Sequence, residues 1–292
     1  MEIIRAKTAG FCFGVKRAVD LVYEKIKDGG AIYTFGPIIH NEVVVGELAE
    51  KGVRILDFKG GSFECGEKEV PDEELKNATV IIRSHGIEKK LYEKLEKTGA
   101  RIEDATCPFV KKIHNIVSEE SSKGKKIVII GNEKHPEVQG IMSYCMTEPS
   151  VIDTSDKAEH LTFEKGDRIC VVSQTTFNYN KFKELVEILT KKEYDIGCVN
   201  TICHATSERQ QEASTIAGQV DCMIVIGGTH SSNSQKLYEI CRRECENTYF
   251  CQTPDDLHLD LPKSVRSVGI TAGASTPNNI IEEVQSYVRT IF

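Results

Sequence analysis

Three cysteines stand at nearly equal intervals along this sequence of 292 residues: Cys12, Cys107 and Cys203, with gaps of 95 and 96 residues. Each lies where a short apolar run gives way to a polar segment that can begin a helix. A helix N-terminus favours the thiolate form that metal ions bind. A threefold fold would bring the three thiolates to one centre, where they could hold a metal cluster with one iron uncapped.

The other eight of the 11 cysteines lie in different contexts. Cys170 and Cys222 lie in or beside apolar runs, where a free cysteine behaves as a small hydrophobe. Cys241, Cys245 and Cys251 leave a zinc site open, although structural zinc usually takes four ligands from closer pairs. No Cys-x-x-Cys pair occurs in the sequence, so the usual ferredoxin pattern is excluded.

Composition and charge limit the classes of function. The residues are 40% hydrophobic and 28% charged, which is typical of a globular protein with two or three units at this length. A net charge of −7 without a basic block argues against nucleic-acid binding, while a small anionic substrate remains open. The odd cysteine number, without a signal-peptide pattern or membrane-length apolar run, predicts a cytoplasmic protein with no membrane partner.

Apolar runs rich in β-branched residues alternate with helical patterns along the chain. The expected strands are 32–35, 79–82, 126–130, 168–172, 222–226 and 265–270. The expected helices are 15–27, 88–97, 109–121, 182–191, 207–217 and 280–288. This order predicts an α/β fold with several parallel sheets. Dividing the chain near Cys107 and Cys203 gives three α/β domains, at 1–107, 108–203 and 204–292.

Polar residues follow five of the expected strands, in the segments 83–86, 131–137, 173–176, 227–234 and 271–277. Taken singly, such residues are ordinary helix caps. Ligands of parallel α/β sheets bind beyond the carboxyl ends of the strands, where helix N-termini present free N–H groups. Five strands followed by polar residues of this kind therefore predict a shared anion-binding site. His40, His85 and His135 lie in turns of this kind, and imidazole N–H groups can donate to phosphate oxygens.

The motifs, taken in order, resemble the 4-hydroxy-3-methylbut-2-enyl diphosphate reductase family (IspH/LytB family) over essentially the whole chain. The first group is Gly10-Phe11-Cys12-Phe13-Gly14-Val15, His40-Asn41, Ser84-His85-Gly86 and Asp104-Ala105-Thr106-Cys107-Pro108. The second group is His135-Pro136-Glu137-Val138-x-Gly140, Ser173-Gln174-Thr175-Thr176, Asn200-Thr201-Ile202-Cys203, Ser231-Ser232-Asn233-Ser234 and Thr271-Ala272-Gly273-Ala274-Ser275-Thr276-Pro277. Each motif is weak alone, and the ordered set is specific.

The resemblance implies a trefoil of three α/β domains around a central [4Fe–4S] cluster. The implied cluster ligands are Cys12, Cys107 and Cys203, which leave one iron open to the hydroxyl oxygen of the substrate. The implied substrate-binding residues are His40, His85, His135, Thr175, Ser231, Ser232, Asn233 and Ser275. The implied catalytic residues are Glu137 as proton source, Thr175 beside the substrate hydroxyl, and His135.

The implied reaction is the reductive dehydroxylation of (E)-4-hydroxy-3-methylbut-2-enyl diphosphate, an allylic diphosphate, to isopentenyl and dimethylallyl diphosphates. This is the last step of the methylerythritol phosphate pathway. Two electrons enter singly, from a donor expected to be a ferredoxin or flavodoxin. Other three-cysteine cluster enzymes, such as a quinolinate synthase-like enzyme or a dehydratase, remain alternatives, as does a non-catalytic iron–sulfur carrier or sensor. A dehydratase needs no net electrons, and a carrier has no need for Glu137 or Thr175.

Overall fold

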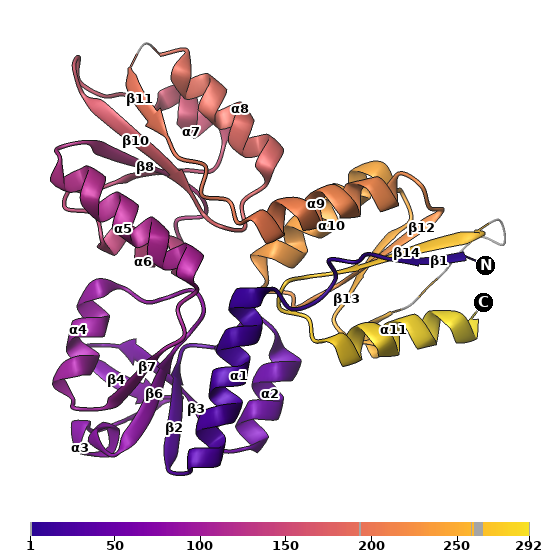
Figure 1. The fold of residues 1–292 in the computed structure, drawn as a ribbon, viewed down its shortest axis with the longest axis horizontal. Helices are drawn as coiled ribbons and strands as arrows, with labels where there is room; N and C mark the ends of the chain where they lie inside the picture. Colours follow the sequence, from indigo (N-terminus) through magenta and orange to yellow (C-terminus); the bar gives the residue numbers. More distant parts are fainter. Residues whose placement is uncertain (1, 193, 258, 260–264, 292) are drawn as a thin grey trace. The chain divides into compact units, whose positions relative to one another are not determined.

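The computed structural model describes residues 2–192, 194–257, 259 and 265–291 (Figure 1). The chain divides into two compact units. The first unit contains residues 1–16, 40–44 and 203–292, and the second contains 17–39 and 45–202. The described strands form three separate sheets, one in the first unit and two in the second. Parallel pairing prevails in all three, as the sequence predicts.

The larger sheet of the second unit has the strand order β5-β4-β3-β2-β6-β7. Its strands are β2 (Ala31–Phe35), β3 (Val53–Lys59), β4 (Ser62–Cys65), β5 (Lys68–Glu69), β6 (Ala78–Ile82) and β7 (Arg101–Asp104). The neighbouring helices in the chain are α1 (Phe13–Asp28), α2 (Glu42–Glu50), α3 (Asp72–Lys76) and α4 (Lys89–Lys97). Contrary to the expectation of parallel strands alone, β4 pairs antiparallel with both β3 and β5. Gly60 and Gly61, both with positive φ, form the turn that reverses the chain after β3.

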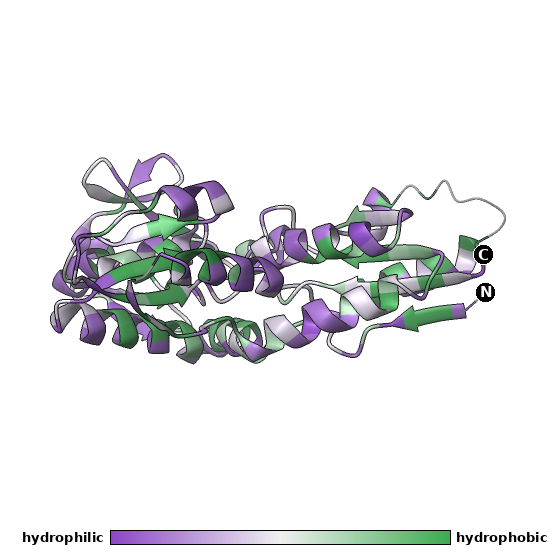
Figure 2. Cartoon of the chain, turned by 90° about the horizontal axis from the view of Figure 1, so that it is seen from above, coloured by the Kyte–Doolittle hydropathy of each residue, from purple (hydrophilic) through white to green (hydrophobic). Residues whose placement is uncertain are grey.

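The second sheet of this unit has the order β11-β10-β8-β9 and is parallel throughout. Its strands are β8 (Lys126–Ile130), β9 (Ser150–Ile152), β10 (Arg168–Ser173) and β11 (Asp195–Cys198). Its helices are α5 (Pro108–Ser122), α6 (Pro136–Ser143), α7 (Ser155–His160) and α8 (Tyr179–Thr190). Val128 and Ile130 pack in one core, whereas Ile127 and Ile129 pack in another. This alternation explains why the strand is apolar on both faces. Figure 2 shows several strands in green, the hydrophobic end of the colour scale.

The sheet of the first unit has the order β1-β14-β12-β13 and is also parallel. Its strands are β1 (Glu2–Arg5), β12 (Cys222–Ile226), β13 (Thr248–Cys251) and β14 (Ser267–Ala272). Its helices are α9 (His204–Ala217), α10 (Ser232–Glu244) and α11 (Asn278–Ile291), with a 3-10 turn at Pro254–Asp256. Ile3 of β1 packs against one core of this unit and Ile4 against the other. The N-terminal strand therefore shares a sheet with strands from the end of the chain, while the three-segment division stays a prediction.

All of the expected strands and helices are present, with some ends shifted by a few residues. The run expected as a strand at 265–270 forms β14 at Ser267–Ala272, and α8 begins three residues before the expected position 182. Helices α2, α3, α6, α7 and α10 were not among the expected elements, nor were strands β1, β3, β4, β5, β7, β9, β11 and β13. No helix within the described ranges is long and apolar enough to cross a membrane.

Two glycine substitutions test this packing. A Cβ at Gly269 in β14 would lie 2.5 Å from Met223 Sδ and 2.7 Å from a methyl group of Ile216, so Gly269→Ala overpacks a buried site. We expect Gly269→Ala to lower the free energy of unfolding by about 1–3 kcal/mol. Gly46→Ala is the matched control, because this exposed position in α2 has open space and should gain about 0.5–1 kcal/mol. Denaturant unfolding measures both, and equal midpoints would contradict the packing described.

Candidate active site

The three evenly spaced cysteines occupy the same local position, at the N-terminus of a helix. Cys107 is the N-cap of α5 and Cys203 the N-cap of α9, while Cys12 directly precedes α1. The carbonyl oxygen of each accepts a bond from the N–H four residues on, as the first turn requires. All three thiols belong to half-buried residues. Each cysteine thus lies where the helix dipole favours an anionic ligand group.

Cys12 and Cys203 lie in the first unit and Cys107 in the second. The N–H of Cys12 donates to the carbonyl of Ala274, 3.2 Å away, which ties its turn to the segment after β14. Arg209 of α9 interacts electrostatically with both Cys12 and Cys203. Sequence reasoning missed Arg209. Its position two turns after Cys203 was the available signal, but no motif marked it.

The alternative zinc site does not fit the structure. Cys241 and Cys245 pack in one core of the first unit, while Cys251 packs in the core on the other face of the sheet. Burial raises the pKa of Cys241 and Cys251 to about 12, so both remain protonated thiols at neutral pH. These cysteines fill core positions, as Cys170 and Cys222 also do.

Glu137 and Thr175 form the most buried polar pair of the predicted site. Glu137 follows β8 and is 1% exposed, and Thr175 follows the neighbouring strand β10. The backbone N–H of Thr175 donates to Glu137 Oε1 at 2.7 Å, and the Thr175 hydroxyl donates to Glu137 Oε2 at 2.7 Å. Burial raises the pKa of Glu137, and these two bonds only partly oppose the shift. The carboxyl group is therefore suited to holding a proton.

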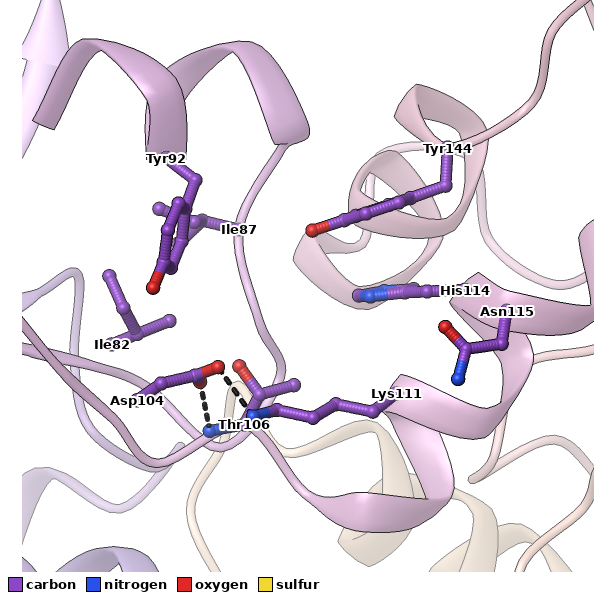
Figure 3. A pocket seen from close by; sticks show the side chains of 9 residues that line it. All are labelled: Ile82, Ile87, Tyr92, Asp104, Thr106, Lys111, His114, Asn115 and Tyr144. Carbon is purple, nitrogen blue, oxygen red and sulfur yellow. Dashed lines mark hydrogen bonds and ion pairs between the residues drawn. The ribbon is translucent and has the colours of Figure 1, made fainter. Parts of the chain in front are cut away.

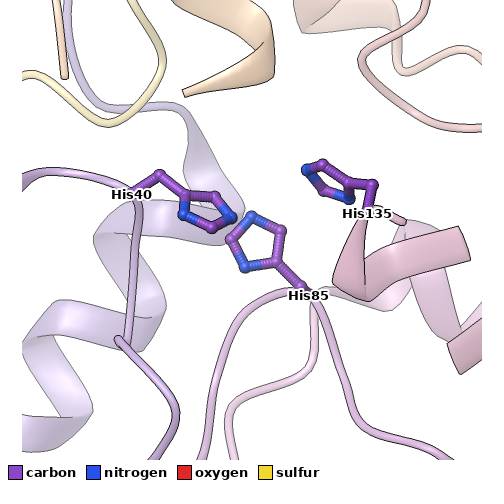
Figure 4. A group of neighbouring side chains, drawn as sticks. All are labelled: His40, His85 and His135. Atoms are coloured by element: carbon purple, nitrogen blue, oxygen red, sulfur yellow. The ribbon is translucent and has the colours of Figure 1, made fainter. Parts of the chain in front are cut away.

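His135 caps α6 and orients its ring through a backbone contact. Its Nδ1 accepts from the N–H of Glu137 at 3.2 Å, so the neutral ring carries its proton on Nε2. The rings of His135 and His85 meet edge to face, with centroids 5.5 Å apart (Figure 4). Both histidines belong to the second unit, and His40, drawn in the same figure, belongs to the first. The second unit thus gathers His85, His135, Glu137 and Thr175 at the ends of its strands.

The first unit gathers hydroxyl groups at the ends of β12 and β14, which are adjacent strands. Ser231 caps α10 by accepting from the N–H of Ser234 at 3.3 Å. Ser275 Oγ donates to the His40 carbonyl at 2.9 Å and lies 3.5 Å from Ser231 Oγ. A Cβ at Gly228 would lie 2.7 Å from that same carbonyl, so only glycine fits there. The first unit therefore brings Ser231, Ser275 and the backbone of His40 together, and their role as ligands stays a prediction.

Asn233, in the first turn of α10, has an unusual environment. It is 4% exposed, yet within the described part of the chain neither Nδ2 nor Oδ1 has a hydrogen-bond partner. Buried amides are almost always bonded, so this one is suited to a polar ligand. Its neighbour Ser232 is half-buried. A ligand with several acceptor oxygens would satisfy the amide and the adjacent helix N-terminus together.

A cavity of about 250 Å³ in the second unit borders the turn that leads to Cys107 (Figure 3). It is lined by Ile82, Ile87, Tyr92, Asp104, Thr106, Lys111, His114, Asn115 and Tyr144. His114 stacks on Tyr144 at a centroid distance of 4.2 Å, and burial lowers its pKa to about 4, which keeps the ring neutral. Asp104 pairs with Lys111 and accepts from the Thr106 N–H at 2.9 Å. None of the predicted site residues lines this cavity, and its Asp104 contacts fix the backbone just before Cys107.

Fold and site together define an α/β protein whose cysteines, histidines and hydroxyl groups follow the carboxyl ends of parallel strands. The model of the LytB protein family matches residues 3–289, and this chain belongs to that family.

Curated relatives match the chain over its full length. The 4-hydroxy-3-methylbut-2-enyl diphosphate reductase of Caldanaerobacter subterraneus subsp. tengcongensis is 45% identical over 293 residues, covering 100% of this chain and 98% of that protein. The reductase of the same name from Clostridioides difficile is 42% identical and covers 100% of both chains.

Solved structures agree with these relatives. The E-1-hydroxy-2-methyl-but-2-enyl-4-diphosphate reductase of Plasmodium falciparum aligns with a TM-score of 0.88 at 28% identity, over 99% of this chain and 87% of that one. A second structure, of (E)-4-hydroxy-3-methyl-but-2-enyl diphosphate reductase, the terminal enzyme of the non-mevalonate pathway, aligns with a TM-score of 0.67 at 40% identity, over 99% of this chain and 100% of that one.

The raised pKa of Glu137 predicts a pH-dependent stability. The folded state holds this proton more tightly than the unfolded chain, so ionising Glu137 in the folded state costs free energy. As pH rises above 4.5, we expect the unfolding free energy of the parent to fall relative to that of Glu137→Gln, by at most about 1.4 kcal/mol per pH unit. The difference levels off above the folded pKa. Denaturant unfolding from pH 4 to 8 measures it.

Glu133→Gln is the matched control, because Glu133 is an exposed carboxylate in the same turn. It should keep the pH dependence of the parent. A difference between parent and Glu137→Gln that is flat or grows more favourable with pH would show that Glu137 does not hold a proton.

Proposed function

We propose that this chain is a 4-hydroxy-3-methylbut-2-enyl diphosphate reductase, which converts its allylic substrate to isopentenyl and dimethylallyl diphosphates. Membership of the LytB family and the full-length relatives of that name support the assignment. The observation that carries the chemistry is the buried Glu137 carboxyl bonded to Thr175. A reductive dehydroxylation must deliver a proton to a departing hydroxyl, and this pair is built to store and pass one.

The proposed cofactor is a [4Fe–4S] cluster held by Cys12, Cys107 and Cys203. The donor set fits such a group, because each thiol stands at a helix N-terminus and a buried cation accompanies two of them. A bound cluster of this kind supplies single electrons and a Lewis-acidic iron for the substrate oxygen. Since three cysteines serve as ligands, one iron has no protein thiolate.

The diphosphate is proposed to bind to donors at the strand ends. Nε2–H of His135 and the amide of Asn233 are donors without a fixed charge, and His85 and His40 add two more rings. Hydroxyl groups of Ser231, Ser232 and Ser275, with the N-terminus of α10, complete the set. The overall charge of −7 would otherwise repel this substrate, so a local concentration of donors is required.

Glu137 and Thr175 are proposed to move the first proton. In the protonated state, Glu137 Oε2–H donates to Thr175 Oγ1, and the Thr175 hydroxyl is then free to donate to the substrate hydroxyl. As the C–O bond breaks, its electron pair leaves with the protonated hydroxyl as water, and two electrons from the external donor reduce the allyl unit to an anion. A second proton at either end of the allyl unit gives the two products. His135, whose backbone contact orders the first turn of α6, holds Glu137 in place.

The donor of the electrons is proposed to be a ferredoxin or flavodoxin in the cytoplasm. A quinolinate synthase-like enzyme is disfavoured by the family match. A dehydratase differs from the reductase because it needs no net electrons, and an electron carrier differs because it has no need for Glu137.

Anaerobic turnover tests the reaction. We expect consumption of (E)-4-hydroxy-3-methylbut-2-enyl diphosphate only when a chemical reductant is supplied. Glu137→Gln should lower the rate about 10²–10⁴-fold, because it removes the acid. Iron and sulfide counts of that variant should equal those of the parent. Consumption of the substrate without reductant would support a dehydratase, and full activity in Glu137→Gln would show that another group is the acid.

Cysteine substitutions test the ligand set. Cys12→Ser, Cys107→Ser and Cys203→Ser should each lose cluster iron, because a serine hydroxyl is a poor substitute for a thiolate. Cys241→Ser and Cys245→Ser are the controls, since their thiols fill a core. Iron and sulfide analysis after anaerobic reconstitution gives the result. Full iron retention in the first three variants would end the cluster assignment.

A further inference from the structure

Arg209 of α9 holds the loop that leads to Cys12. Its side chain is buried, with 3% exposed. Nε donates to the carbonyl of Thr8 at 2.9 Å, Nη2 contacts the same oxygen, and Nη2 also donates to the carbonyl of Gly10 at 2.7 Å. Bonds from a charged donor to backbone oxygens are stronger than neutral ones. Two backbone carbonyls of the loop, those of Thr8 and Gly10, are therefore fixed to one guanidinium.

Glu212, three residues further along α9, holds the other side of the same loop. Its Oε1 accepts from the Lys7 N–H at 2.8 Å, and its Oε2 accepts from the Thr8 N–H at 2.9 Å and the Thr8 hydroxyl at 2.6 Å. Residues three apart share a helix face, so Arg209 and Glu212 act on the loop together. We call Arg209 and Glu212 together the clamp. Because Cys203 is the N-cap of α9, the clamp joins the Cys12 turn to the helix that Cys203 caps.

The charge of Arg209 has a second role. The groups that interact electrostatically with its guanidinium are Cys12, Cys203 and Glu212. The oxygens of Glu212 already accept three bonds from the loop, and Nη1 of Arg209 is buried without a hydrogen-bond partner within the described residues. A buried cation is costly unless an anion accompanies it. The two cysteines, as ligands of an anionic cluster, supply that anion.

We propose that Arg209 is a positioning residue that fixes the Cys12 turn and raises the reduction potential of the group bound by Cys12 and Cys203. A fixed positive charge favours the state with one more electron. The charge thus assists electron entry, and the clamp keeps the ligand geometry constant while the charge of the group changes. This inference rests on the proposed cluster for its redox part only.

The experiment compares Arg209→Met and Arg209→Lys with the control Arg243→Met, an exposed arginine in α10. The first readout is the midpoint potential of the reconstituted protein, from anaerobic titration followed by electron paramagnetic resonance. We expect a more negative midpoint in Arg209→Met, with iron and sulfide counts equal to those of the parent. Arg209→Lys keeps the charge and should stay closer to the parent, and Arg243→Met should not differ.

The second readout is amide hydrogen exchange of residues 9–12 in cluster-free protein. Loss of the bonds to the Thr8 and Gly10 carbonyls should speed exchange about tenfold in both Arg209 variants. The lysine variant is included because an ammonium group cannot reproduce the forked donor geometry of a guanidinium. Glu212→Gln tests the clamp separately and should also speed exchange, even if Arg209→Met fails to fold.

The two arms fail in different ways. An unchanged midpoint in Arg209→Met overturns the electrostatic role, and unchanged exchange in the Arg209 and Glu212 variants overturns the clamp. A parent that binds no iron and sulfide refutes the proposed cofactor, while the exchange result still stands for the clamp.

Discussion

Parallel pairing between neighbouring strands is the constraint on which the site depends. Because β8 and β10 run in the same direction, their carboxyl ends meet at one edge of the sheet, and residues 38 positions apart become bonded neighbours. An antiparallel pair would place the turn after one strand at the opposite edge from the turn after the other. Both residues of the Glu137–Thr175 pair are also buried.

The same constraint, repeated in the first unit, brings the turns after β12 and β14 together. Each turn ends in a helix, so the backbone contributes oriented N–H groups at little further cost. Of the side chains that gather there, Ser231 and Ser275 are short and uncharged, and the carboxylate of Glu42 accepts from Thr229 of the turn after β12. Cys107 and Cys203 occupy the same helix-cap position, where their thiols are available as soft ligands in the proposed cluster.

The sequence was most informative where residue type and position give the same signal. Runs such as Ile127–Ile130 are β-branched and buried on both faces, and their strands were predicted with the right limits. The limits of helix α10 were not predicted, because it begins within a polar serine and asparagine run that was interpreted as helix caps or a ligand-binding turn. Edge strand β1 was missed because Glu2 and Arg5 break its apolar pattern. Arg209 could not be predicted, since its importance depends on a loop almost 200 residues earlier in the chain.

The pairing of β1 with β14 has a consequence for the order of events during synthesis. Strand β1 leaves the ribosome first, but its partner begins at Ser267, so the first unit cannot close until nearly the whole chain has been made. Residues 17–202 carry two complete sheets and can fold earlier. The loop around Cys12 must likewise wait for α9 before it is held. A metal group that needed Cys12 and Cys203 together would therefore find both held in place only after α9 has been made.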